Sequence, residues 1–183
     1  MEIVMAFLND PVVTRSLGAM LSVVLLIGSW QKLRDMVVFA AALDNYRLLP
    51  DFLVSPVAWA VAVTEAVAGV LLLLNDTASA GAWFSLALLA TVTSAVVVNL
   101  LRGNTAIDCG CGGLSSQPLA WSLVARNVVL MCIALLAAQE GASRPLVWAD
   151  YLTTAGVVLG LLGLYTIANQ LMTNAPRVLA VRH

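Results

Sequence analysis

Long apolar blocks separated by short polar segments dominate the pattern of this chain. Five blocks, at about 11–31, 56–74, 80–101, 119–139 and 151–172, are each long enough to cross a bilayer as an α-helix. The pattern therefore predicts an all-α integral membrane protein. We expect a single multi-pass domain over residues 1–183, built as a four-helix transmembrane bundle with a fifth, C-terminal transmembrane helix.

The segment at about 35–49 is too polar to span a membrane, yet its apolar residues recur at helical spacing. Proline follows it at position 50. This pattern is typical of an amphipathic helix, and we expect the segment to lie at the membrane interface.

Composition supports a membrane protein and narrows its partners. The chain has 183 residues, of which 61% are hydrophobic and only 10% are charged, and soluble domains are far richer in charge. A net charge of −1 gives no basic surface for nucleic acid, so the lipid bilayer is the expected surrounding. No small-residue cleavage site closes the first apolar block, which we expect to remain as a membrane anchor.

Candidate chemistry lies in the loop 102–117, where Cys109 and Cys111 stand one residue apart between glycines. A disulfide between them would close a very small ring, and strained disulfides are the labile ones. Two thiolates could also hold a soft metal such as copper, or the pair could be a passive loop feature. Cys132 lies inside an apolar block, where we expect it to pack in the core as a small hydrophobe.

Two arguments about orientation conflict. The cysteine loop shares its side of the membrane with Lys32, Arg34 and Arg47, which the positive-inside rule assigns to the cytoplasm. Disulfides, however, persist in the periplasm rather than in the cytosol. We follow the cysteine chemistry and expect the loop to face the periplasm. Lys32 is interpreted as a basic anchor at the membrane interface.

Two charged residues fall inside the apolar blocks. Glu65 and Arg126 stand at similar distances from the cysteine-side ends of their predicted helices, so we expect them to pair, with Asn127 adding hydrogen bonds. Charges at membrane depth usually face another helix and have a partner. Such a pair fits a proton or quinone site, or a buried contact that fixes the helix register.

Several of these residues resemble a known family. Gly28-x3-Lys32-Leu33 and Glu65-x3-Gly69 resemble motifs of the DoxX/DoxD-like membrane proteins. The loop Asp108-Cys109-Gly110-Cys111-Gly112, followed by a helix with Arg126-Asn127, resembles the MauE (methylamine utilisation) family of that superfamily. The resemblance implies a DoxX-like bundle in the bacterial inner membrane, with Cys109 and Cys111 as a redox pair.

The resemblance also implies a function. It indicates a role in the maturation of periplasmic methylamine dehydrogenase, whose small subunit is rich in disulfides, together with a thioredoxin-like, MauD-like partner. The chain has no second cysteine pair, which a self-contained quinone-linked oxidase generally uses, so we expect thiol–disulfide exchange with the partner. No cofactor is required by this chemistry, and a quinone is the candidate that the sequence leaves open. A copper-handling protein and a non-catalytic structural partner in a membrane assembly remain the alternatives.

Overall fold

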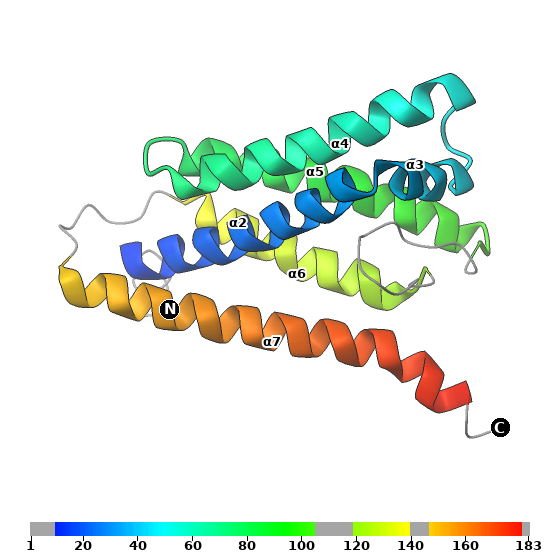
Figure 1. The fold of residues 1–183 in the computed structure, drawn as a ribbon. Helices are drawn as coiled ribbons and strands as arrows, with labels where there is room; N and C mark the ends of the chain where they lie inside the picture. Colours follow the sequence, from blue (N-terminus) through cyan, green and yellow to red (C-terminus); the bar gives the residue numbers. More distant parts are fainter. Residues whose placement is uncertain (1–9, 105–118, 140–146, 181–183) are drawn as a thin grey trace.

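The computed structural model describes residues 10–104, 119–139 and 147–180, and the side chains of 172–180 are not described. All regular secondary structure in these ranges is helical (Figure 1). The helices are, in order, α2 (Pro11–Arg34), α3 (Met36–Asn45), α4 (Asp51–Leu73), α5 (Ala78–Leu101), α6 (Trp121–Ala137) and α7 (Trp148–Ala180).

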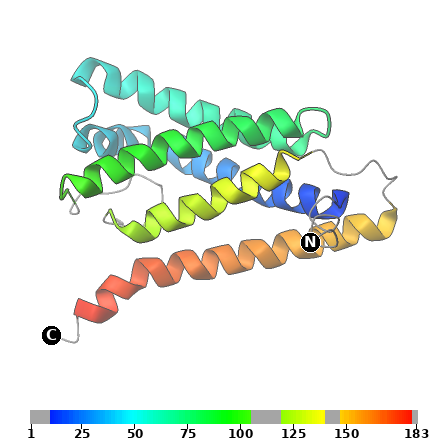
Figure 2. The same ribbon diagram turned by 180° about the vertical axis from the view of Figure 1, so that it is seen from behind.

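Helices α2, α4, α5 and α6 pack into a bundle, with α2 against α4 and α6, and α5 between α4 and α6. The core includes Leu21, Leu25, Leu89 and Leu130, which are at most 8% exposed. Helix α7 contacts α2 and runs along the outside of the bundle (Figures 1 and 2). Helix α3 lies at the end of the bundle where α2 and α5 end and α4 and α6 begin.

By length and composition, α2, α4, α5 and the Trp148–Leu171 part of α7 can each cross a membrane. Helix α6 has 17 residues, about 25 Å at 1.5 Å per residue, which is near the short limit of transmembrane helices. The prediction of an all-α membrane protein is therefore confirmed. The predicted segment 119–139 corresponds to α6, which is shorter by two residues at each end.

Helix α4 begins at Asp51, five residues before the predicted start at 56. Pro50 stands directly before the helix in an extended conformation, and Pro56 lies inside the helix. The first proline, rather than the second, therefore marks the helix start. Helix α7 also runs beyond the predicted segment 151–172 at both ends.

Helix α3 corresponds to the predicted interfacial segment 35–49 but ends earlier, at Asn45. Arg47 has a φ of 47°, which the helix cannot continue through. The helix packs on α4 and α2. Tyr46 is 5% exposed, whereas Val37, on the opposite face, is 81% exposed. Helix α3 therefore turns one face to the bundle and closes its end.

Small residues allow close contact between neighbouring helices. A Cβ at Gly81 would lie 2.7 Å from the backbone nitrogen of Leu72, so α4 and α5 meet at backbone distance there. Helix α2 is tied to α4 by the hydroxyl of Ser22, which donates to the carbonyl oxygen of Gly69 at 2.6 Å. Such hydrogen bonds pair polar groups for which lipid offers no hydrogen-bond partner.

Candidate functional site: a charged cavity inside the bundle

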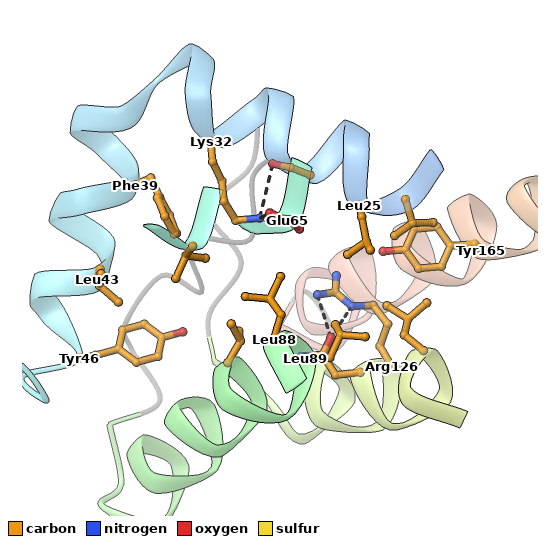
Figure 3. Close-up of a pocket in the computed structure, with 16 residues that line it drawn as sticks. Leu25, Lys32, Phe39, Leu43, Tyr46, Glu65, Leu88, Leu89, Arg126 and Tyr165 are labelled. Atoms are coloured by element: carbon orange, nitrogen blue, oxygen red, sulfur yellow. Dashed lines mark hydrogen bonds and ion pairs between the residues drawn. The ribbon is translucent and has the colours of Figure 1, made fainter. Parts of the chain in front are cut away.

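A cavity of about 130 Å³ lies toward the α3 end of the bundle, and all six helices contribute to its wall (Figure 3). Most of the wall is apolar, with valine and leucine side chains from α2, α4, α5 and α6. Six polar or charged side chains stand out among the wall residues: Lys32, Tyr46, Glu65, Arg126, Asn127 and Tyr165. Charged groups in an apolar, membrane-spanning domain usually mark a functional site.

On one side of the cavity, Lys32 of α2 and Glu65 of α4 form an ion pair with an N–O distance of 2.6 Å. The two side chains are 11% and 12% exposed. Lys32 also lies 5.7 Å from the ring centroid of Phe39, which makes a cation–π contact between α2 and α3. The pair therefore joins three helices at the point where the bundle closes.

Gly28 makes room for this ion pair. It stands one turn before Lys32, and its carbonyl oxygen accepts a hydrogen bond of 3.4 Å from the Lys32 ammonium. A Cβ at this position would lie 2.7 Å from Oε1 of Glu65. Any larger residue at position 28 would push the carboxylate away from Lys32.

On the other side of the cavity, Arg126 of α6 is held by amide oxygens. Its Nε and Nη2 each donate to Oδ1 of Asn127 at 3.4 Å, and its Nη1 donates to Oδ1 of Asn169 at 3.2 Å. The Asn127 amide in turn donates to Oγ1 of Thr93 at 3.0 Å. This network joins α5, α6 and α7 and fixes the position of the guanidinium.

The expected direct ion pair between Glu65 and Arg126 is wrong, because within the described part of the chain Glu65 pairs with Lys32. Both residues do line the same cavity, and the expected hydrogen bonding of Asn127 to Arg126 is present. The interpretation of Lys32 as an interfacial anchor missed its role. The spacing of Gly28 and Lys32 shows only that the two residues share one face of α2, and the packing of α4 brings Glu65 against that face.

Two tyrosine hydroxyls complete the polar wall. Burial raises the pKa of Tyr46, which lies outside the spanning helices, to about 12. Tyr46 therefore remains a neutral phenol at physiological pH. Tyr165 extends from α7 toward the cavity (Figure 3), and among the described residues its hydroxyl has no hydrogen-bond partner.

Cys109 and Cys111 lie outside the described residues. The helix ends that flank their loop, at Leu101 of α5 and Trp121 of α6, lie at the same end of the bundle as α3. The core position expected for Cys132 is wrong, because this side chain is exposed on the surface of α6. It stands eleven residues after Trp121, about 16 Å along the helix axis from the start of α6.

Comparisons with known proteins identify the family. The profile of the methylamine utilisation protein MauE family matches residues 10–139, which covers α2 to α6. The methylamine utilization protein MauE of Paracoccus denitrificans is 39% identical over 131 residues, 70% of each chain. The protein of that name from Paracoccus versutus is 38% identical, over 85% of this chain and 86% of its own.

A third relative, from Methylorubrum extorquens, bears the same name and is 37% identical over 133 residues. It aligns with 72% of this chain over 71% of its own length. No solved structure matches the chain significantly. The extent of the profile match and the identities together show that this chain, a multi-pass membrane protein, belongs to the methylamine utilisation protein MauE family.

Proposed function

We propose that this chain acts in methylamine utilisation as a bacterial inner-membrane protein that exchanges thiols and disulfides with a thioredoxin-like partner. Its client would be the small subunit of methylamine dehydrogenase, and its redox pair would be Cys109 and Cys111, facing the periplasm. The observation that carries this proposal is the glycine-bracketed cysteine pair in a chain of this family.

The position of Cys132 supports a redox role for Cys109 and Cys111 alone, without Cys132. Cys132 is exposed on the surface of α6, about 16 Å along the helix from its start, and we expect lipid to surround it there. A thiolate is disfavoured in apolar surroundings. The loop pair must therefore complete an exchange reaction without help from the third cysteine.

The reaction with a partner is balanced without any further oxidant. One loop thiolate attacks a partner disulfide and forms a mixed disulfide, and the partner's first thiolate leaves. The second loop thiolate then attacks the mixed disulfide, which yields a loop disulfide and a reduced partner. Two electrons pass to the partner and two protons follow, and the reverse direction uses the same intermediate.

The test is to change Cys109 or Cys111 to serine and measure client maturation in cells. Each change should abolish maturation, and one of them should accumulate a mixed disulfide with a thioredoxin-like protein. Cys132→Ala is the matched control and should support normal maturation. Full maturation with both loop cysteines changed to serine would overturn the redox proposal and favour a structural role.

The orientation can be tested separately. A membrane-impermeant thiol reagent, applied to intact spheroplasts after mild reduction, should label the loop cysteines of a Cys132→Ala variant. Labelling that occurs only after lysis would place the loop in the cytoplasm instead.

A further inference from the structure

The charges around the cavity do not balance within the described part of the chain. Lys32 and Glu65 neutralise each other at 2.6 Å. Arg126 then leaves one positive charge, and each of its described hydrogen bonds goes to a neutral amide oxygen. Arginine stays protonated in proteins, so Arg126 cannot relieve this charge by losing its own proton.

Two N–H groups of the guanidinium have no partner among the described residues. Arginine has five N–H groups, and the bonds to Asn127 and Asn169 occupy three of them. Tyr165 offers a further hydroxyl from the same side of the cavity (Figure 3). These donors line the same cavity and can bond an oxygen acceptor, and a negatively charged acceptor would also neutralise Arg126.

The rest of the wall is suited to hydrocarbon. Val61 of α4, Leu88 and Val92 of α5 and Leu130 of α6 surround the polar groups. The same helix bundle stands in the bilayer, where acidic lipids and fatty acids are the available amphiphiles. An apolar cavity in which one fixed cation has no acidic partner among the described residues would therefore select an apolar molecule with one anionic end.

We propose that this cavity binds the head of an anionic amphiphile, with a carboxylate or phosphate oxygen on Arg126 and the apolar chain along the valine and leucine wall. Asn127 and Asn169 act as positioning residues, because they hold the guanidinium in place. The Lys32–Glu65 pair is already neutral and forms the opposite wall. This site is independent of the cysteine chemistry, so it can be tested in a variant that lacks Cys109 and Cys111.

The test uses the purified full chain in maltoside micelles, with dodecanoate and dodecyl phosphate as probes. Native mass spectrometry and thermal unfolding would report one bound probe and the stabilisation that binding gives. Arg126→Gln should weaken binding by roughly thirtyfold or more, as expected when one partner of a buried charge pair is removed. Arg126→Lys should retain part of the affinity, and Arg15→Gln, at an exposed position near the start of α2, should retain all of it.

A second variant tests the cavity without changing its charge. Leu88→Trp should fill the apolar space and reduce the affinity for both probes, which keeps the proposal testable if Arg126→Gln fails to fold. Tighter binding of dodecanoate would identify a fatty acid as the source of the head, and tighter binding of dodecyl phosphate would identify an acidic lipid.

Three results would overturn the proposal. The first is equal binding of dodecyltrimethylammonium, because a cation should be repelled. The second is a neutral alkyl quinone that binds more tightly than either acid and does not depend on Arg126. The third is tighter probe binding in Asp108→Asn than in the unchanged chain, because that carboxylate would then be the resident partner of Arg126.

Discussion

Breaking the ion pair between Lys32 and Glu65 should destabilise the bundle unequally, depending on which partner is removed. The Glu65 carboxylate is fourteen residues into α4 and is confined beside Gly28, so its short side chain cannot extend to the membrane interface. Lys32 is two residues from the end of α2 and can extend toward the interface. Lys32→Met should therefore cost more than Glu65→Gln.

The magnitude follows from the burial of the pair. Removing one partner of a fully buried pair costs about 3 to 5 kcal/mol. The two side chains retain 11% and 12% exposure, so the lower part of that range applies. We expect about 3 kcal/mol for Lys32→Met. For Glu65→Gln we expect about 1.5 kcal/mol, below that range, because the unpaired Lys32 can extend toward the interface. The double variant should recover a coupling energy of about 2 kcal/mol.

The assay is equilibrium unfolding in mixed micelles with increasing dodecyl sulfate, followed by the fluorescence of the five tryptophans. A matched control cycle combines Lys32→Met with Asp76→Asn, which changes an exposed carboxylate in the turn between α4 and α5. The control cycle should be additive within about 0.5 kcal/mol. Additivity of Lys32→Met and Glu65→Gln would refute the ion pair between these two residues.

Three further predictions concern other parts of the chain. Gly81→Ala should destabilise the bundle by about 1 to 3 kcal/mol in the same unfolding assay, because the added Cβ would press on the α4 backbone. Gly156→Ala is the control and should be neutral or stabilising, because a Cβ there meets nothing within 4 Å. The pKa of Tyr46 is about 12 in the folded chain and 10 in the unfolded one, so the unfolded state ionises first as the pH rises. The free energy of unfolding should therefore be unaffected by Tyr46 below pH 10 and should fall between pH 10 and 12. Tyr46→Phe should remove this part of the pH dependence, and an unchanged pH profile in that variant would contradict the burial of Tyr46. A nitroxide spin label can be attached to Cys132 in a chain without the loop cysteines. Because the exposed Cys132 side chain is expected to face lipid, oxygen should relax the EPR signal of the label strongly and a polar nickel complex should relax it weakly. Protection from both reagents would mean that the side chain is buried.

The long apolar blocks were sufficient to predict the all-α membrane architecture. In a bilayer every backbone hydrogen bond must be made within the chain, so long apolar blocks have few alternatives to the α-helix. Helix ends were less predictable. Proline is compatible with a helix start and with its first turns, and so Pro56 was mistaken for the start that Pro50 marks.

Glu65, Arg126 and Asn127 were identified from sequence because charged and amide side chains inside apolar blocks are costly and stand out. The partners of Glu65 and Arg126 were not all identified from sequence. Distance along a helix gives depth only if the helix ends lie level, and α4 begins earlier than expected while α6 begins later. The choice of Lys32 over Arg126 as the partner of Glu65 depends on how α2 and α4 pack around Gly28, and that contact exists only in the tertiary structure.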